Sequence, residues 1–128
     1  MDFLSSNSML LMQKSMDFLW TKQAAISNNI ANAETPGYKA KVVTFEENLR
    51  ERLEQALSSN TPRVSARRVI GESEISVMEA AESTRMDGNG VNTTEQMVEL
   101  VRNAYQLQYV MNSISTDLAT LRIAVRGQ

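Results

Sequence analysis

Few side chains in this sequence could carry out chemistry, and the missing types exclude whole classes of site. The 128 residues include no Cys and no His, which excludes a disulfide, a Cys/His zinc site, a thiol nucleophile and an imidazole base. The carboxylate pairs Glu46/Glu47 and Glu51/Glu54 remain, but they lie on the charged face of an expected surface helix, where no pocket is implied. No glycine is followed by the Lys-Ser/Thr of a phosphate-binding loop. We therefore expect no enzyme activity and no catalytic, metal-binding or cofactor-binding residues.

The stretch Asp87-Gly88-Asn89-Gly90 begins like a calcium-binding loop. Later positions of such a loop require an oxygen ligand, a glycine and a glutamate, and this chain has Val91, Asn92 and Val98 there instead. The stretch therefore predicts a tight Asn-Gly turn just before the C-terminal helix.

Charge and hydropathy restrict the partners. The net charge is −2 and the sequence pI is near 5.2, and no aromatic residue interleaves with the small basic cluster of Arg63, Arg67 and Arg68. We expect that cluster to be solvated or in contact with protein, and we expect no nucleic-acid partner. No segment approaches the ~18 apolar residues of a membrane span, and residues 1–4 do not resemble a secretory signal.

The C-terminal region predicts the most regular element, a helix from Thr94 to Arg126. Apolar residues recur there in alternating steps of three and four, the heptad spacing of a helix that packs against another helix. Asn92 or Thr93 is expected to cap its start, with Glu95 or Gln96 completing a capping box. The stripe consists of Met97, Leu100, Ala104, Leu107, Met111, Ile114, Leu118, Leu121 and Val125.

A second heptad helix is predicted over roughly residues 5–34. It is expected to end at Thr35-Pro36-Gly37-Tyr38, because Pro36 disfavours helix at Thr35 and Gly37 supplies the positive φ of a type II turn. Gln23 is the polar member of this stripe, which otherwise consists of Met9, Met12, Met16, Leu19, Ile26, Ile30 and Ala33.

The middle of the chain is less well specified. Residues 44–57 predict a short amphipathic helix with Phe45, Leu49, Leu53 and Leu57 on one face. Beyond Pro62 large apolar residues are few, which predicts an extended or mobile segment. The predicted fold is mainly α, with two long terminal helices that pair as an antiparallel coiled coil. It divides into an N-terminal part (1–38), a middle segment (39–90) and a C-terminal helix (91–128). Because one antiparallel pair leaves much of each helix unburied, the stripes require further copies or partners.

The end of the first helix is unusually rich in asparagine. Asn28, Asn29 and Asn32 are weak helix formers, and together they cost roughly 2 kcal/mol relative to alanine. They mark either a frayed helix end or amides that bond to neighbouring backbones or subunits and so offset this penalty.

Residues 25–40, AISNNIANAETPGYKA, resemble the N-terminal signature of the bacterial flagellar rod, hook and hook-associated proteins. That family pairs the signature with a C-terminal heptad helix, as this chain does. The short chain and residues 87–92, 95–97 and 103–109 are similar to the short proximal-rod members. Rod component B is the more similar subfamily, and its short sister, component C, is the alternative.

This resemblance implies a structural subunit of the basal-body rod, exported by the flagellar type III apparatus without a cleaved signal and located in the periplasm. The implied partners are other copies, other rod proteins, the MS-ring protein and the adaptor at the rod base. The rod would transmit torque and conduct exported subunits, with assembly contacts made by the two stripes, the three asparagines and residues 35–38. The rival without this resemblance is a generic coiled-coil adaptor, which predicts a closed dimer or trimer.

Overall fold

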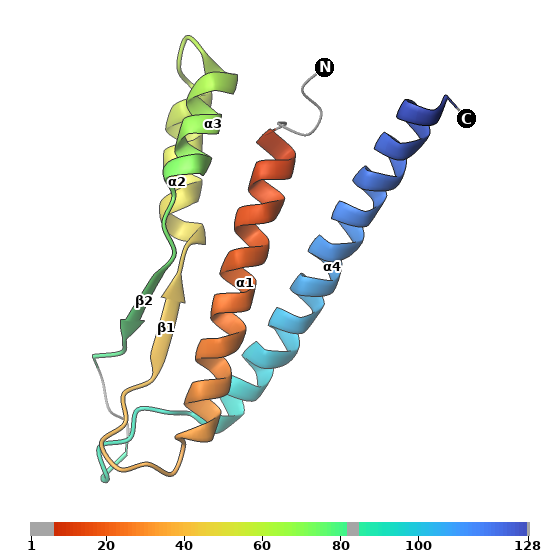
Figure 1. Ribbon diagram of the computed structural model, residues 1–128. Helices are drawn as coiled ribbons and strands as arrows, with labels where there is room; N and C mark the ends of the chain where they lie inside the picture. Colours follow the sequence, from red (N-terminus) through yellow and green to blue (C-terminus); the bar gives the residue numbers. More distant parts are fainter. Residues whose placement is uncertain (1–6, 82–84, 128) are drawn as a thin grey trace.

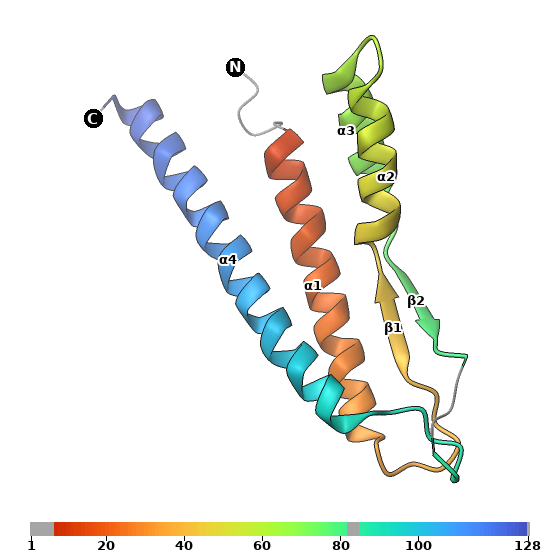
Figure 2. The same cartoon turned by 180° about the vertical axis from the view of Figure 1, so that it is seen from behind.

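The computed structural model describes residues 7–81 and 85–127. Helix α1 lies in the middle, with α4 on one side and the strands and two short helices on the other (Figures 1 and 2). The elements, in chain order, are α1 (Asn7–Ala31), β1 (Lys41–Thr44), α2 (Glu46–Leu57), α3 (Pro62–Glu72), β2 (Ser76–Glu79) and α4 (Thr93–Arg126).

The two terminal helices pack side by side and run in opposite directions, which confirms the predicted antiparallel pairing (Figure 1). The α4 helix begins where its capping residue predicts, because Asn92 Oδ1 accepts a hydrogen bond from Glu95 N at 3.3 Å. It ends at Gly127, whose φ of 68° is a left-handed conformation typical of helix C-termini. No helix within residues 7–81 and 85–127 is long and apolar enough to cross a membrane.

The prediction of an extended segment after Pro62 is wrong for residues 62–72, which form α3. Pro62 occupies the first turn of this helix, where its missing N–H is tolerated. Ala66, Val69 and Ile70 are buried, and their spacing is that of an amphipathic helix whose apolar residues are small. The following strand, β2, pairs antiparallel with β1, from Lys41 opposite Glu79 to Thr44 opposite Ser76.

The main apolar core lies between α1 and this middle segment. Phe18 of α1 stacks on Phe45 with ring centroids 5.3 Å apart, and Leu49 and Ile70 are buried beside them. The predicted apolar face of α2 is correct at Phe45 and Leu49, whereas Leu57 at its end is exposed. One side of α1 is therefore covered by the chain's own middle segment and needs no second copy.

The heptad stripe of α4 is divided into two halves by the way α4 lies on α1. The half-buried members are Leu100, Leu107, Ile114 and Leu121. The exposed members, which we call the outer stripe, are Met97, Ala104, Met111, Leu118 and Val125. The face of α4 toward α1 is centred on Asn103, beside the stripe, and α4 diverges from α1 toward its C-terminus (Figures 1 and 2).

Candidate functional site

At the end of the helix pair where α1 ends and α4 begins, two loops form what we call the junction, residues 32–40 and 85–92. Gly37 N donates to Asp87 O at 3.0 Å, and Gly90 N donates to Tyr38 O at 2.9 Å. Gly37 and Gly88 have φ angles of 71° and 77°, which only glycine adopts without strain. The positive φ predicted at Gly37 is confirmed.

The tight turn predicted at Asn89-Gly90 is displaced along the chain. The turn is closed by Gly88 N donating to Arg85 O at 3.0 Å, so it spans residues 85–88. The residue with positive φ is accordingly Gly88. The expectation failed because the side chain of Asn89 bonds to the loop after α1 and to Val91 N, so Asn89 does not lie at the centre of a turn.

Asn89 ties the two loops of the junction together. Its side chain is fully buried, and Nδ2 donates to Asn32 O at 2.9 Å and to Thr35 O at 2.7 Å. Its Oδ1 accepts from Val91 N at 2.7 Å. The carbonyls of Asn32 and Thr35 also accept hydrogen bonds from Thr35 N and Tyr38 N. Asn89 is therefore a second partner for both, and it holds the loop after α1 from 54 or more residues away.

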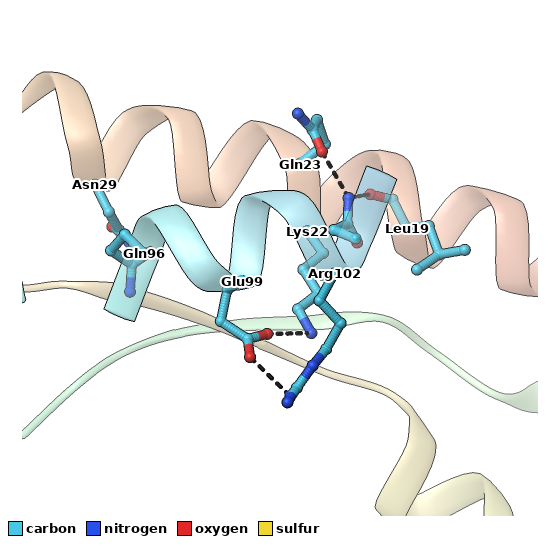
Figure 3. A network of polar contacts seen from close by, with 8 residues as sticks. Leu19, Lys22, Gln23, Asn29, Gln96, Glu99 and Arg102 are labelled. Carbon is cyan, nitrogen blue, oxygen red and sulfur yellow. Dashed lines mark hydrogen bonds and ion pairs between the residues drawn. The ribbon is translucent and has the colours of Figure 1, made fainter. Parts of the chain in front are cut away.

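Asn29 connects α1 to both β1 and α4. It is 1% exposed, and its amide exchanges two hydrogen bonds with the Lys41 backbone, from Nδ2 to O at 2.9 Å and from N to Oδ1 at 2.7 Å. Nδ2 also donates to Gln96 Oε1 at 3.0 Å, and Figure 3 shows these two side chains together. Tyr38 Oη donates to Asn29 Oδ1 at 3.3 Å. Burial, and less so Glu79, raises the pKa of Tyr38, which keeps this donor protonated at neutral pH.

The other two asparagines bond within their own helix. Asn28 Nδ2 donates to Ala24 O at 3.1 Å and Asn32 Nδ2 donates to Asn28 O at 2.8 Å, while Thr35 Oγ1 donates to Asn32 Oδ1 at 3.2 Å. The hypothesis that these amides bond to a neighbouring backbone is therefore confirmed for Asn29, and bonding to other subunits stays a prediction. Only Asn29, of the three, reaches a neighbouring element with its side chain among the bonds described.

A buried polar pair sets the register of the two long helices. Asn103 Nδ2 donates to Gln23 Oε1 at 2.7 Å and to Leu19 O at 3.1 Å. Gln23 is the polar member of the α1 stripe, so it needs a polar partner across the interface. Asn103 lies beside the heptad stripe, so the stripe does not predict it. The signal in the sequence is Gln23, whose place on the α1 stripe implies a polar partner on α4, and a buried asparagine of this kind specifies register between helices.

An ion-pair cluster lies on the same interface. Glu99 accepts from Lys22 Nζ at 3.0 Å and from Arg102 at 2.8 Å (Figure 3). The hydrogen bond from Lys22 is the largest influence on the Glu99 carboxyl. Together with the attraction of both cations it holds the pKa of Glu99 below its ordinary value, against the opposing effect of burial.

Acid is expected to weaken the α1–α4 pairing through Glu99. Because the folded-state pKa of Glu99 lies below the ordinary 4.5, its stabilisation is complete above that pH and is lost as the pH falls through the folded-state pKa. We expect Glu99→Gln to lower the free energy of unfolding by about 1 kcal/mol at neutral pH, with a difference that closes in acid. Denaturant unfolding of both proteins across this pH range measures it. Glu54→Gln, at the exposed pair with Arg50, serves as the control, and a pH-independent difference for Glu99→Gln would contradict the prediction.

Apolar surface that the fold does not use lies on α4 and beside it. Trp20 is 58% exposed and borders a groove of about 380 Å³ between α1 and α4, lined also by Ala104 and Met111 of the outer stripe. A larger apolar groove of about 680 Å³ runs between α1, α2 and α4, with Tyr105 and Tyr109 at one edge. No cluster of three or more metal-binding side chains occurs within residues 7–81 and 85–127.

The residues expected to make assembly contacts fall into three environments. Leu19, Ile26 and Asn29 are buried inside the chain. Half-buried ones are Met12, Met16, Ile30, Asn32, Tyr38, Leu100, Leu107, Ile114 and Leu121. Exposed ones are Asn28, Thr35, Pro36, Gly37, Met97, Ala104, Met111, Leu118 and Val125.

Comparison with known proteins shows which proteins the chain resembles. The family described as "Flagella basal body rod protein" matches residues 20–39, which are the second half of α1 and one loop of the junction. The flagellar basal body rod protein FlgB of Borrelia hermsii is 29% identical over 126 residues, covering 91% of this chain and 93% of the relative. The FlgB proteins of Bacillus subtilis (28% over 107 residues, 83% of each chain) and Yersinia enterocolitica (27% over 124 residues, 90% and 85%) are also similar.

Over most of its length the chain is therefore similar to the flagellar basal body rod proteins. It is a structural subunit of the rod, and the alternatives of component C and a generic adaptor are not favoured. The family signature in this rod protein coincides with residues that hold α1, β1 and α4 together, namely Asn29, Asn32 and the Gly37 turn. The signature therefore includes one loop of the junction and the Asn29 contacts with β1 and α4.

Proposed function

We propose that this rod protein assembles through the outer stripe of α4 into the proximal part of the rod, the tubular shaft that transmits torque and conducts exported subunits. The observation that carries the proposal is the outer stripe itself. Its members keep heptad spacing along α4, yet the fold leaves Met97, Met111, Leu118 and Val125 between 45% and 79% exposed. A heptad face of this kind is suited to packing against a further helix.

The energetics favour assembly over a solitary chain. Burying a Met, Leu or Val side chain stabilises by about 1.5–3 kcal/mol, so the stripe could contribute several kcal/mol to each contact after the cost of association. A contact between different faces of successive copies repeats without closing and generates a helical filament. A tube that conducts other chains is one form of such an assembly.

The junction supports this role by fixing the two long helices relative to each other before assembly. Its hydrogen bonds, with the Asn103–Gln23 pair, set the register of α4 on α1. The spacing of the outer stripe relative to α1 is then the same in every copy.

We propose as further partners the MS-ring protein, the adaptor at the rod base and the type III export apparatus, with a basal-body location reached without a cleaved signal.

In-cell photocrosslinking from position 111 tests the proposal. Met111 is 50% exposed and lies on the outer stripe, whereas replacement of Asn32 would disturb the hydrogen bonds of the junction. We expect adducts with rod subunits, including other copies, or with the MS-ring or adaptor proteins. A probe at exposed Thr120, on another face of α4, is the matched control and should give fewer such adducts. Adducts with non-flagellar proteins alone, in motile cells that express the variant, would contradict the proposal.

A further inference from the structure

Asn89-Gly90 is the only Asn-Gly dipeptide in the sequence. Asparagine followed by glycine is chemically labile, because a residue without a side chain leaves its backbone nitrogen free to approach the asparagine amide. Every other asparagine precedes a residue with a side chain that hinders this approach. The lability of Asn89 therefore depends on whether the fold allows its amide and the Gly90 nitrogen to meet.

The junction restrains both reacting groups. The Gly90 N–H donates a hydrogen bond to Tyr38 O at 2.9 Å. The Asn89 amide is held on both sides, with Nδ2 donating to Asn32 O and Thr35 O and Oδ1 accepting from Val91 N. The side chain is fully buried, so attack by Gly90 requires all of these hydrogen bonds to break and the junction to open.

We propose that Asn89 is a deamidation site that is protected by folding, and that the acid formed there prevents the junction from closing again. In the open chain the Gly90 nitrogen attacks Cγ of Asn89 and forms a new C–N bond. The side-chain nitrogen leaves as ammonia, taking the Gly90 proton, and a five-membered imide remains. Water then opens the imide and yields aspartate or isoaspartate at position 89.

The product conflicts with the geometry of the closed junction. A carboxylate has no hydrogen to donate at neutral pH, yet its oxygen would occupy the position of Nδ2, 2.9 Å from Asn32 O and 2.7 Å from Thr35 O. Two carbonyl oxygens would face a buried negative charge, and both would lose the hydrogen bond that Asn89 donates. Isoaspartate would also lengthen the backbone where Gly90 N meets Tyr38 O. A chain that has been deamidated at Asn89 therefore cannot form the native hydrogen bonds of the junction again.

Mass spectrometry of the full-length chain tests the protection. The chain is incubated at mildly alkaline pH either in native buffer or in guanidinium chloride, then digested with trypsin. Cleavage after Arg85 and Arg102 releases residues 86–102, which contain both Asn89 and Asn92. We expect the amide-to-acid mass change at Asn89 to be more than about tenfold slower in native buffer, because reaction requires opening of the junction. Asn92, followed by threonine, should change slowly under both conditions.

A matched variant distinguishes the effect of Gly90 on the deamidation reaction from the effect of folding. Gly90→Ala should slow the reaction in denaturant while leaving Asn89 itself in place. Equal deamidation rates at Asn89 in the native and the denatured wild-type chain would contradict the proposal that folding protects this residue. Isomerisation at Asp87-Gly88 gives no mass change and cannot be mistaken for the reaction at Asn89.

The consequence for the junction is tested by Asn89→Asp, with Asn92→Asp as its control. Aspartate caps a helix as well as asparagine does, so Asn92→Asp should unfold at the wild-type denaturant midpoint. Asn89→Asp should show a clearly lower midpoint or no cooperative transition. A wild-type midpoint for Asn89→Asp would overturn the claim that the acid prevents closure, while the rate comparison tests protection independently.

Discussion

Replacing Asn29 by alanine is expected to lower the free energy of unfolding by about 3–5 kcal/mol. The change removes the partner of the Lys41 N–H and C=O groups and of Gln96 Oε1 in a site that is nearly closed to water. Each buried polar group left without a partner costs about 1–3 kcal/mol. The loss is a large part of the 5–15 kcal/mol that ordinarily stabilises a domain. Denaturant unfolding measured by circular dichroism checks the value.

Asn28→Ala is the matched control, one residue away on the same helix. Asn28 is exposed and its amide bonds only to Ala24 O among the described contacts. Because alanine is a better helix former by up to ~0.7 kcal/mol, this variant should be as stable as the wild type or slightly more stable. Equal losses for the two variants would show that the helix end as a whole, and not the Asn29 contacts, determines stability.

Leu118→Asp is expected to abolish rod assembly and swimming while leaving the single chain folded. Leu118 is 45% exposed on the outer stripe, so the change should alter the free energy of unfolding by less than about 1 kcal/mol. In a packed contact between subunits the new carboxylate would be buried without a partner, which costs several kcal/mol at every copy. Swimming in soft agar and unfolding of the purified variant provide the two measurements.

Thr116→Asp introduces the same charge two residues earlier, about 200° around the helix from Leu118. Thr116 is exposed and lies off the stripe. It should leave swimming close to normal. Normal swimming of Leu118→Asp would refute the assembly role of the outer stripe, and failure of both variants would show that any charge on this part of α4 is harmful.

The long helices and their antiparallel pairing follow from sequence because heptad spacing is a local pattern with a direct physical meaning. The same pattern cannot say which half of the α4 stripe faces α1. That depends on Asn103, whose contacts with Leu19 and Gln23 span 80 or more residues. The α3 helix escaped prediction because its buried residues, Ala66, Val69 and Ile70, are few and stand among Arg, Ser and Glu.

The polar residues of the site were only partly predictable. Three asparagines within five residues at a helix end suggest amide-to-backbone bonding, and Asn29 confirms it. Which of them turns inward depends on the path of β1, which no local signal gives. The role of Asn89 could not be predicted, because Asn-Gly indicates a turn and no local signal shows that its side chain bonds to carbonyls 54 or more residues away.

The pairing of α1 with α4 also determines when the fold is completed. Asn29 and Gln96 are 67 residues apart in sequence, and Leu19 and Asn103 are 84 apart, so forming these contacts closes a loop over most of the chain. Closing such a loop costs conformational entropy before any contact compensates for it. When the chain emerges one end first, from a ribosome or a narrow channel, α1 can pack early against α2 and α3. It can pair with α4 only after residues 96–103 have emerged, so the fold is completed late in the release of the chain.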